Sequence, residues 1–289
     1  MSGAAQIALL GDGRRLHLHH GPIDIVALAE GGEAEVEAAY TQAGNRFASI
    51  LDELVAELPR LRAPVGAARP LLNGAVARRM ASAVWPHREA FVTPMAAVAG
   101  AVADDVLAAL AERRDLTRVY VNNGGDIAFH LAAGQSFDAG IVDDAHAPAM
   151  DARVRLSHDM PVRGLATSGW RGRSHSLGVA DAVTVLAGCA AEADVAATLI
   201  ANAVDVDHPA VTRAPANSLS DDSDLGDLQV TVAVGELPAD AVERALAAGL
   251  ARARAMQAQG LLFSAYLSLQ DRVKTVGAEA RLTAAGGAA

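Results

Sequence analysis

The chain contains a single cysteine, Cys189, among its 289 residues, so no internal disulfide forms. Aromatic residues make up only 3% of the sequence, whereas apolar residues of all kinds reach 52%. This apolar content excludes a disordered chain, and the predicted core is mainly Ala, Val and Leu. Because small side chains each bury little area, we expect homo-oligomerisation to add contacts. We interpret Cys189, which has apolar Ala and Gly neighbours, as a small buried hydrophobe rather than a reactive thiol.

Basic clusters are also missing. The 24 Lys and Arg residues are outnumbered by 34 Asp and Glu residues, and the formal charge is −10. A surface that tracks a phosphate backbone needs clustered Lys and Arg, so nucleic-acid binding is not expected. A small nucleotide or anionic metabolite remains compatible with this charge, because a divalent cation can mediate the contact.

Long apolar runs are lacking as well, since Asp, Glu, Gly or Arg interrupts each alanine-rich stretch. We find no basic segment followed by an apolar one near the N-terminus. The sequence therefore predicts neither a secretion signal nor a membrane span, and we expect a cytoplasmic protein.

Periodicity and turn residues predict an α+β fold in a single domain over residues 1–282, followed by a flexible tail at 283–289. Predicted strand pairs fall between helices, which favours mixed or antiparallel sheet over a doubly wound parallel one. Helices are predicted over 33–60, 73–84, 95–113, 190–204 and 238–257. Two or three strands are expected within 5–28, and further strands over 117–122, 126–132, 137–142, 152–158, 163–168, 181–187, 228–234 and 260–275, with a loop over 205–227.

The first segment with chemical potential is Asn122-Asn123-Gly124-Gly125-Asp126, which follows a β-branched strand. Asn and Gly tolerate positive φ, so this segment is typical of a tight hairpin turn. The two glycines also allow a ligand to approach the backbone, whose N–H groups could face an anion. A plain hairpin and a ligand-binding turn explain the segment equally well.

The second segment runs from Gly164 to Gly178, where a strand leads into Thr167-Ser168-Gly169 and then into a loop with Arg171, Arg173 and His175. Hydroxyl groups, arginines and glycines supply many hydrogen-bond donors for a phosphate or carboxylate. An ordinary polar loop is the alternative, and the density of donors slightly favours a binding role.

The third feature is the pair Asp194 and Thr198, four residues apart on a predicted helix and so on one face. A carboxylate and a hydroxyl are oxygen ligands of the kind that Mg²⁺ or Ca²⁺ prefers. An Asp in a first helical turn that complements the helix dipole would look the same.

Two other clusters favour structural interpretations. His17 and His19 share one face of a predicted strand, but no cysteine or suitably spaced acid accompanies them in the sequence, so a metal site is the weaker hypothesis. The acidic run 221–227 lacks the terminal Glu of a calcium loop and is interpreted as a solvated loop.

Taken in order, these segments resemble the ApbE-like superfamily, whose characterised members are Mg²⁺-dependent FAD:protein FMN transferases. That superfamily has a Gly-x-x-x-Asp helix, a strand ending in Gly-Gly-Asp, a strand ending in Ser-Gly, and an Asp-x-x-x-Thr helix. The corresponding residues here are Gly100 to Asp104, Gly124 to Asp126, Ser168-Gly169, and Asp194 to Thr198. The chain is most similar to the branch known as uncharacterised protein family 0280.

The resemblance implies an α+β fold with antiparallel sheet, and Mg²⁺ and FAD as cofactors. It implies Asp194 and Thr198 as metal ligands, with a backbone carbonyl such as that of Val98, and His175 as the catalytic residue. The residues that it implies for cofactor binding are Asn123, Gly124, Gly125, Asp126, Thr167, Ser168, Gly169, Ser174, Ser176, Gly178 and Asp181.

The chain departs from the transferases at two places. It has Ala99-Gly100 where they have Lys-Gly, and it lacks the proline that follows their histidine segment, here around His175. Two functions therefore stay open. One is transfer of FMN to a protein Ser or Thr, and the other is an accessory or carrier role that binds a flavin or another anionic metabolite. The branch's link to sulfur and homocysteine metabolism suggests the second role.

Overall fold

The computed structural model describes residues 3–141, 152–221, 223–277 and 282–284. Its mixture of helices with antiparallel strands confirms the predicted α+β class. The chain forms two compact units that interleave in sequence. Unit 1 comprises Met1–Ser136, Ser157–Ala166 and Gly188–Val195, and unit 2 comprises Phe137–Leu156, Thr167–Ala187 and Ala196–Ala289. The expected single domain over 1–282 remains a prediction.

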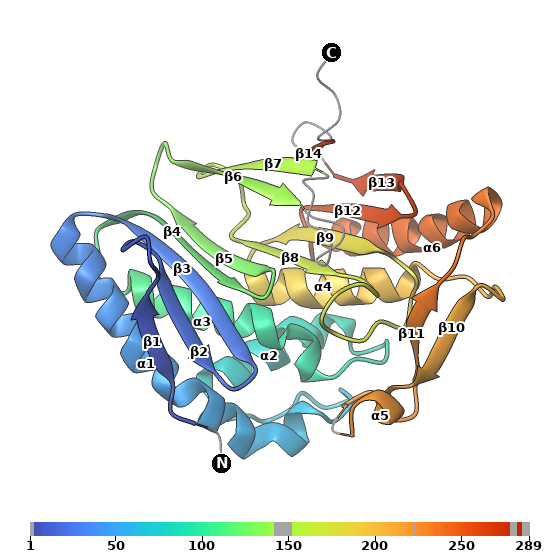
Figure 1. Cartoon of the computed structure of the whole chain (residues 1–289), viewed down its shortest axis with the longest axis horizontal. Helices are drawn as coiled ribbons and strands as arrows, with labels where there is room; N and C mark the ends of the chain where they lie inside the picture. The colour runs from blue at the N-terminus through green and yellow to red at the C-terminus, as the bar shows by residue number, and fades with distance from the viewer. Residues whose placement is uncertain (1–2, 142–151, 222, 278–281, 285–289) are drawn as a thin grey trace. The chain divides into compact units, whose positions relative to one another are not determined.

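Unit 1 is built on an antiparallel sheet with the strand order β1, β2, β3, β4, β5, β8. Helices α1, α2 and α3 lie together on one side of β1–β5 (Figure 1). The strands of unit 1 are β1 (Gln6–Leu9), β2 (Leu16–His20), β3 (Ile23–Gly31), β4 (Leu116–Asn123), β5 (Asp126–Leu131) and β8 (Gly164–Ser168), whose last two residues belong to unit 2.

The helices of unit 1 follow the predicted periodicity. Apolar side chains of α1 at three- and four-residue spacing, such as Ala43, Phe47, Ile50 and Leu54, are buried against the sheet. The helical elements are α1 (Glu33–Leu61), α2 (Ala75–Val84), the short 3₁₀ helices η1 (Trp85–His87) and η2 (Pro94–Ala97), α3 (Val98–Ala111), and the first part of α4 (Ala190–Ala203). The helix predicted over 95–113 thus begins with a 3₁₀ turn, in which Pro94 occupies the first position.

Unit 2 contains strands β9, β12 and β13 in that order, a two-stranded sheet of β10 and β11, and a three-stranded sheet in the order β14, β7, β6. These strands are β6 (Ser136–Ile141), β7 (Ala152–Ser157), β9 (Ala182–Ala187), β10 (Val211–Pro215), β11 (Gln229–Val234), β12 (Ser264–Leu269), β13 (Arg272–Val276) and β14 (Leu282–Ala284). The helices are the rest of α4, α5 (Ala216–Leu219) and α6 (Ala239–Ala258).

The loop prediction for 205–227 was wrong, because β10 and α5 lie within it. Strand β10 forms by antiparallel pairing with β11, more than ten residues farther along the chain. The Asp, Pro and Asn residues around β10 predict a loop from neighbouring positions alone. The strand forms because it pairs with a segment farther along the chain, and this pairing outweighs the local preference.

The single strand predicted over 260–275 was also wrong, because it is the hairpin of β12 and β13. Its two-residue turn, Gln270-Asp271, has positive φ values of 45° and 60°. Such turns usually contain Gly or Asn, so the sequence carries no familiar hairpin signal here. Strand β14 overlaps the start of the predicted tail, and residues 285–289 lie outside the described residues.

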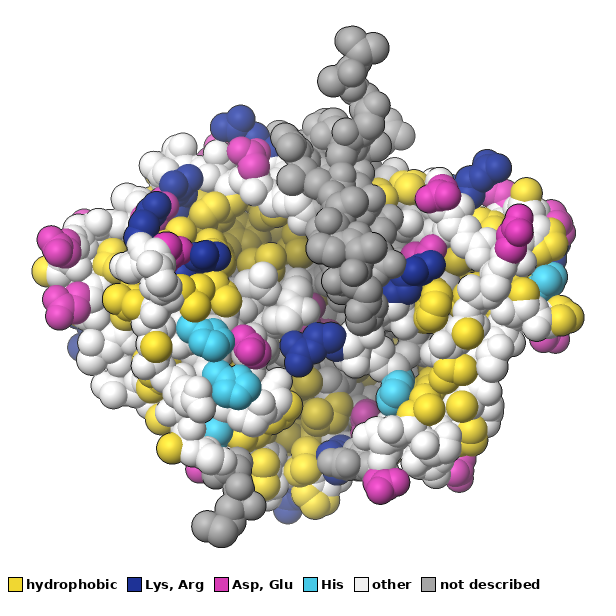
Figure 2. Space-filling model, viewed as in Figure 1, with side chains coloured by type: hydrophobic (Ala, Val, Ile, Leu, Met, Phe, Trp, Pro, Cys, Tyr) yellow, Lys and Arg dark blue, Asp and Glu magenta, His cyan; other side chains and the backbone are white. Residues whose placement is uncertain are grey.

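Among the described residues, one helical stretch is long and apolar enough to cross a membrane, Pro94–Ala111. More than half of this stretch, 56%, is buried inside the protein, as expected of a core helix. On the face shown in Figure 2, Lys and Arg side chains lie in small groups among acidic ones, without a continuous basic surface.

Within unit 1, Gly164 of β8 leaves no room for a side chain. A Cβ there would lie 2.1 Å from both the amide nitrogen of Ala190 and the carbonyl carbon of Cys189. We expect Gly164→Ala to lower the free energy of unfolding by about 1–3 kcal/mol, because backbone atoms must move to accept the methyl group.

Urea denaturation measures this effect, and Gly66→Ala is the control, because a Cβ at Gly66 meets no heavy atom within 4 Å. Equal stability of the two variants would show that β8 does not constrain the start of α4.

Candidate functional site

The predicted Gly-Gly turn connects β4 to β5. Asn123 pairs with Asp126, so Gly124 and Gly125 form a two-residue connection with φ values of 68° and 111°. Positive φ at both positions is the geometry of a type I′ hairpin, which glycine adopts without steric cost. The side-chain oxygen of Asn122 accepts the Gly125 N–H at 2.9 Å. A Cβ on Gly125 would meet nothing within 4 Å, so this backbone is open to an approaching molecule.

Asn123 ties this turn to the first residues of α3. Its side chain is buried, and its Nδ2 donates a hydrogen bond to the carbonyl oxygen of Ala99 at 3.0 Å. A buried amide requires such a partner, so the bond fixes where the turn lies relative to α3. Asp126, on the other side of the turn, is also buried.

Two carboxylates join the starts of α3 and α4. Asp194 of α4 accepts the N–H of Gly100 at 3.0 Å, and the N–H of Ala99 also contributes to its environment. In return, Asp104 of α3 accepts the N–H groups of Ala190 and Ala191 at 3.0 and 2.9 Å. Backbone donors in a first helical turn have no partner within their own helix, so each helix supplies the cap of the other.

Gly100 permits this exchange because the backbones of the two helices approach closely. A Cβ on Gly100 would lie 2.3 Å from the carbonyl oxygen of Ala190. The Gly100 to Asp104 pattern therefore has a structural explanation in unit 1, since the glycine allows the approach and the aspartate caps the neighbouring helix.

The electrostatics of this junction disfavour negative charge. Burial, with a smaller contribution from the nearby charge of Asp104, raises the pKa of Asp194 to about 7 despite the two N–H donors. Burial likewise raises the pKa of Asp104 and of Glu192. The charge of Asp104 also raises the pKa of Asp194 and of Glu192, so each additional negative charge at this junction costs free energy.

Cys189 lies beside the same junction and is only partly buried. Burial raises the pKa of its thiol to about 12, and the charge of Asp104 acts in the same direction. A thiol with so high a pKa is a poor nucleophile at neutral pH, in agreement with the interpretation of Cys189 as unreactive.

Thr198 lies one turn beyond Asp194 on α4. Both residues keep some exposed surface, although protein atoms surround the Asp194 carboxyl closely enough to raise its pKa. Val98 is the first residue of α3. The structure describes no group of three or more His, Cys, Asp or Glu side chains arranged to hold a metal ion within residues 3–141, 152–221, 223–277 and 282–284. The oxygen donors available near Asp194 are thus a carboxylate, a hydroxyl and backbone carbonyls.

The Thr-Ser-Gly segment lies in unit 2, where β8 ends. The Thr167 hydroxyl lies 2.8 Å from that of Thr184 in β9, within hydrogen-bond distance, and Ser168 is partly exposed. Gly169 must be a glycine, because a Cβ there would lie 2.3 Å from the carbonyl oxygen of Asp181. Two strand ends therefore meet closely at this turn.

Asp181 organises the loop that follows. One carboxylate oxygen accepts the Trp170 indole N–H at 3.0 Å and the Arg171 Nε–H at 2.8 Å. The other oxygen accepts the N–H of Gln270 at 2.6 Å. The Arg171 guanidinium also lies 5.0 Å from the centroid of the Trp170 ring. Asp181 thus holds the loop to the β12–β13 turn inside unit 2.

The remaining predicted loop residues divide by exposure. Ser174 and His175 are exposed. Ser176 is buried, and its hydroxyl contacts the side chain of Asn202 at 3.4 Å and accepts the N–H of Gly178 at 3.2 Å. Gly178 packs against α4, where a Cβ would lie 2.1 Å from the carbonyl oxygen of Ala201.

Sequence reasoning missed the acid next to the histidine pair. Asp24 of β3 has one oxygen 3.0 Å from His17 Nε2 and the other 3.5 Å from His19 Nδ1. His19 is the cross-strand partner of Asp24, so only strand pairing brings the acid into place. The group is a partly exposed cluster of polar side chains.

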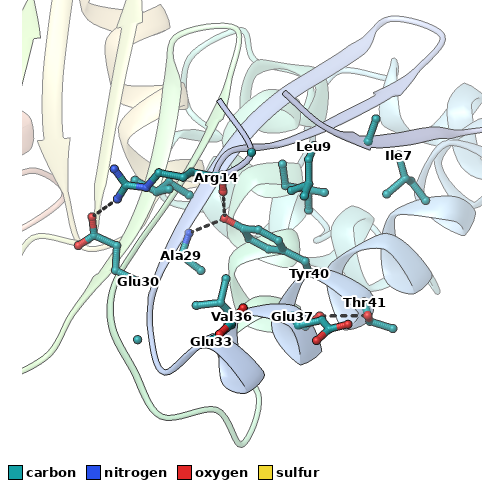
Figure 3. Close-up of a pocket in the computed structure, with 15 residues that line it drawn as sticks. Ile7, Leu9, Arg14, Ala29, Glu30, Glu33, Val36, Glu37, Tyr40 and Thr41 are labelled. Atoms are coloured by element: carbon teal, nitrogen blue, oxygen red, sulfur yellow. Dashed lines mark hydrogen bonds and ion pairs between the residues drawn. The ribbon is translucent and has the colours of Figure 1, made fainter. Parts of the chain in front are cut away.

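A cavity of about 920 Å³ in unit 1 was also not foreseen. It lies where β1, the β1–β2 turn and the end of β3 face the first turns of α1 (Figure 3). None of the motif residues lines it. No sequence motif marks it, because its walls are ordinary apolar and glutamate side chains.

Comparison with known proteins gives three kinds of match. A family model described as AbpE bacteria matches residues 7–275. A UPF0280 protein of Methanopyrus kandleri is 38% identical over 210 residues, which is 71% of this chain and 80% of that protein. A UPF0280 protein of Methanococcoides burtonii is 35% identical over 127 residues, 43% of this chain and 51% of that protein. The crystal structure of the Pseudomonas stutzeri flavinyl transferase ApbE in its apo form covers 95% of both chains, with a TM-score of 0.45 and 13% identity.

The raised pKa of Asp194 makes stability depend on pH. The folded state keeps this proton to higher pH than the unfolded chain, whose carboxyl has the ordinary value of 3.8. The folded state therefore binds more protons between about pH 4 and pH 7, and the free energy of unfolding falls as pH rises through that window. Asp194→Asn removes this titrating proton. We therefore expect the variant to lose up to about 1.4 kcal/mol per pH unit of the slope, the value for a difference of one bound proton.

Urea denaturation at a series of pH values measures the slope. Asp52→Asn is the matched control, because Asp52 is exposed on α1. An unchanged slope in Asp194→Asn would mean that the Asp194 carboxyl titrates as it does in water.

Proposed function

Because this chain belongs to the AbpE bacteria family, we propose that it binds a flavin dinucleotide such as FAD together with a divalent cation. Asp194 and Thr198 are the proposed ligands of the ion. The observation that carries the proposal is the state of Asp194: its desolvated carboxyl has a raised pKa and takes part in no ion pair within the part of the chain that is described. A cation is the partner that would stabilise its charged form.

The residues fit Mg²⁺ on chemical grounds. A carboxylate and a hydroxyl one helical turn apart are hard oxygen donors, and Mg²⁺ commonly binds one or two carboxylates together with substrate phosphates and water. The hydrogen bond from Gly100 occupies only part of the carboxylate's capacity, since each ionised oxygen can accept more than one contact. When bound, the ion would neutralise negative charge on the pyrophosphate of the nucleotide.

Donors for the nucleotide itself come from the two glycine-containing segments. The Gly124-Gly125 turn has open backbone beside Gly125, and Asn123 and Asp126 flank it. In unit 2, Ser174 and His175 are exposed in the loop that Asp181 organises. We propose nucleotide contacts for each segment by itself: the Gly124-Gly125 turn in unit 1, and Thr167, Ser168, Gly169, Ser176 and Gly178 in unit 2.

The proposed reaction is transfer of FMN to the hydroxyl of a Ser or Thr in an acceptor protein, as the resemblance to the ApbE-like transferases implies. The acceptor oxygen forms a bond to the phosphorus of the FMN half of FAD, and the bond from that phosphorus to the bridging oxygen breaks. AMP leaves with the bridging oxygen, and the hydroxyl proton passes to a base. His175 is the proposed base, since its imidazole is exposed and histidine is the side chain most often used in general acid–base catalysis.

Two features favour a second function, namely binding of a flavin or another anionic metabolite without transfer. Ala99 stands where the transferases have lysine, and no proline follows His175 in its loop. In this version Asp194 and Thr198 bind the ion, and the protein acts as a carrier or accessory factor.

Calorimetric titration with FAD tests the binding site. We expect Mg²⁺ to strengthen FAD binding to the wild-type protein by about tenfold or more, because ion and pyrophosphate charges are coupled. Thr198→Val removes a proposed ligand but leaves the Asp194 cap intact, so we expect it to lose most of the Mg²⁺ effect.

Asp194→Asn tests the carboxylate, with Asp52→Asn as the control and circular dichroism to confirm folding. FAD binding that is equally tight with Mg²⁺ and with a chelator, in every variant, would refute the proposed ion site.

Incubation with FAD, Mg²⁺ and Ser- or Thr-containing acceptor peptides distinguishes the two functions. Transfer predicts equal amounts of AMP and flavinylated peptide, and His175→Gln should slow both by about 100-fold if the imidazole is the base. Tight FAD binding without AMP release identifies the carrier function instead. Absence of both binding and turnover contradicts both versions.

A further inference from the structure

The cavity beneath β1 has the dimensions of a small-molecule site. Its volume of about 920 Å³ falls in the range of roughly 300–1,000 Å³ that is usual for ligand pockets. It belongs to unit 1 and shares no residue with the proposed nucleotide site. Figure 3 shows that α1 forms one side, while β1 and the end of β3 form the other.

One part of the cavity is apolar and exposed to water. Ile7 and Leu9 are 45% and 54% exposed, although both belong to a strand. Leu16, Leu28 and Val36 extend this apolar lining. Strand β1 is at the end of the strand order, so no further strand covers it within the described residues. Such a surface favours an apolar ligand that removes it from water.

Tyr40 supplies a rigid aromatic wall. Its hydroxyl donates a hydrogen bond to the carbonyl oxygen of Arg14 at 2.5 Å and accepts the N–H of Ala29 at 3.1 Å (Figure 3). These two bonds connect α1 to β3 and to the β1–β2 turn. The ring is therefore held in place before any ligand arrives, and its face can attract a cation.

The charge around the cavity is negative. Three glutamates and one arginine line it. Glu30 is already paired with Arg14 and Arg118. Glu33 and Glu37 are exposed, lie four residues apart on one face of α1, and form no ion pair with any described residue. Their like charges repel each other, and a cation between them would relieve that repulsion.

From these observations we propose that the cavity binds a small amphipathic cation, an apolar chain or ring that carries one ammonium group. The apolar part contacts Ile7 and Leu9, and the ammonium group lies near Glu33, Glu37 and the face of Tyr40. A second copy of this chain fits less well, because the formal charge of −10 would oppose its approach to an acidic surface.

Ligands matched in chain length test the proposal. Calorimetry with n-octylammonium, n-octanol and n-octanoate, below their aggregation concentrations, compares one apolar body with three head groups. We expect octylammonium to bind about tenfold or more tightly than octanoate, with octanol between them. Equal affinity for all three, or no binding of octylammonium, would overturn the proposal.

Variants with altered charge test whether Glu33 and Glu37 recognise the ammonium group. Glu33→Lys combined with Glu37→Lys changes only exposed side chains, and we expect it to abolish or invert the preference for the ammonium group. Asp52→Lys is the control for charge reversal on α1, because it makes one such reversal, half the change of the double variant, at an exposed position outside the cavity lining. If both proteins retain the preference, Glu33 and Glu37 do not recognise the cation and the assignment is wrong.

Leu9→Ser tests the apolar wall without adding charge, since Leu9 is already half exposed and its replacement should leave the fold intact. We expect it to weaken octylammonium binding by about tenfold or more.

Sedimentation of the wild-type protein and of the Leu9 variant tests whether a second copy of this chain covers β1 instead of the ligand. A wild-type dimer that Leu9→Ser dissociates, together with absent octylammonium binding, would show that a second copy covers β1. The affinity of these variants for FAD should equal that of the wild-type protein. A negative result for the cavity would therefore leave the proposed nucleotide site untouched.

Discussion

The exchange of carboxylate caps between α3 and α4 is the interaction on which the candidate site in unit 1 depends. Asp104 and Asp194 each accept backbone N–H groups at the start of the other helix. A buried carboxylate is unfavourable without donors, and a helix N-terminus supplies donors that have no other partner. The arrangement satisfies both requirements at once. It also forces the two backbones together, which is why only glycine fits at position 100.

The same arrangement affects the protonation of the Asp104 and Asp194 carboxyl groups. Hydrogen bonds stabilise the two carboxylates only in part, and burial still raises both pKa values. The junction is therefore rigid and short of positive charge, a combination that suits a cation site built on helices rather than on flexible loops. The hairpin turn of β4 and β5 is held beside this junction by Asn123.

Unit 2 uses a related device. Asp181 accepts hydrogen bonds from an indole, a guanidinium and a backbone N–H, and it thereby orders a loop with many glycines.

The cavity beneath β1 is not organised by a buried carboxylate. Its walls are apolar and acidic, and Tyr40 is fixed by two hydrogen bonds. The two proposed binding sites therefore differ in chemistry, since one is polar and glycine-containing and the other is amphipathic.

Sequence alone determined the α+β class, the five longer helices, most of the strands and the Gly124-Gly125 turn, because periodicity and turn residues act over a few neighbouring positions. It also identified Asp194 as part of a motif. Only the tertiary structure decided what Asp104 and Asp194 contact, because their partners lie 86 to 94 residues away. The pairing of β10 with β11, the place of Asp24 beside His17, and the cavity under β1 likewise depend on contacts between distant segments. Local patterns specify which element forms, whereas the chemistry of a site depends on which elements pack together.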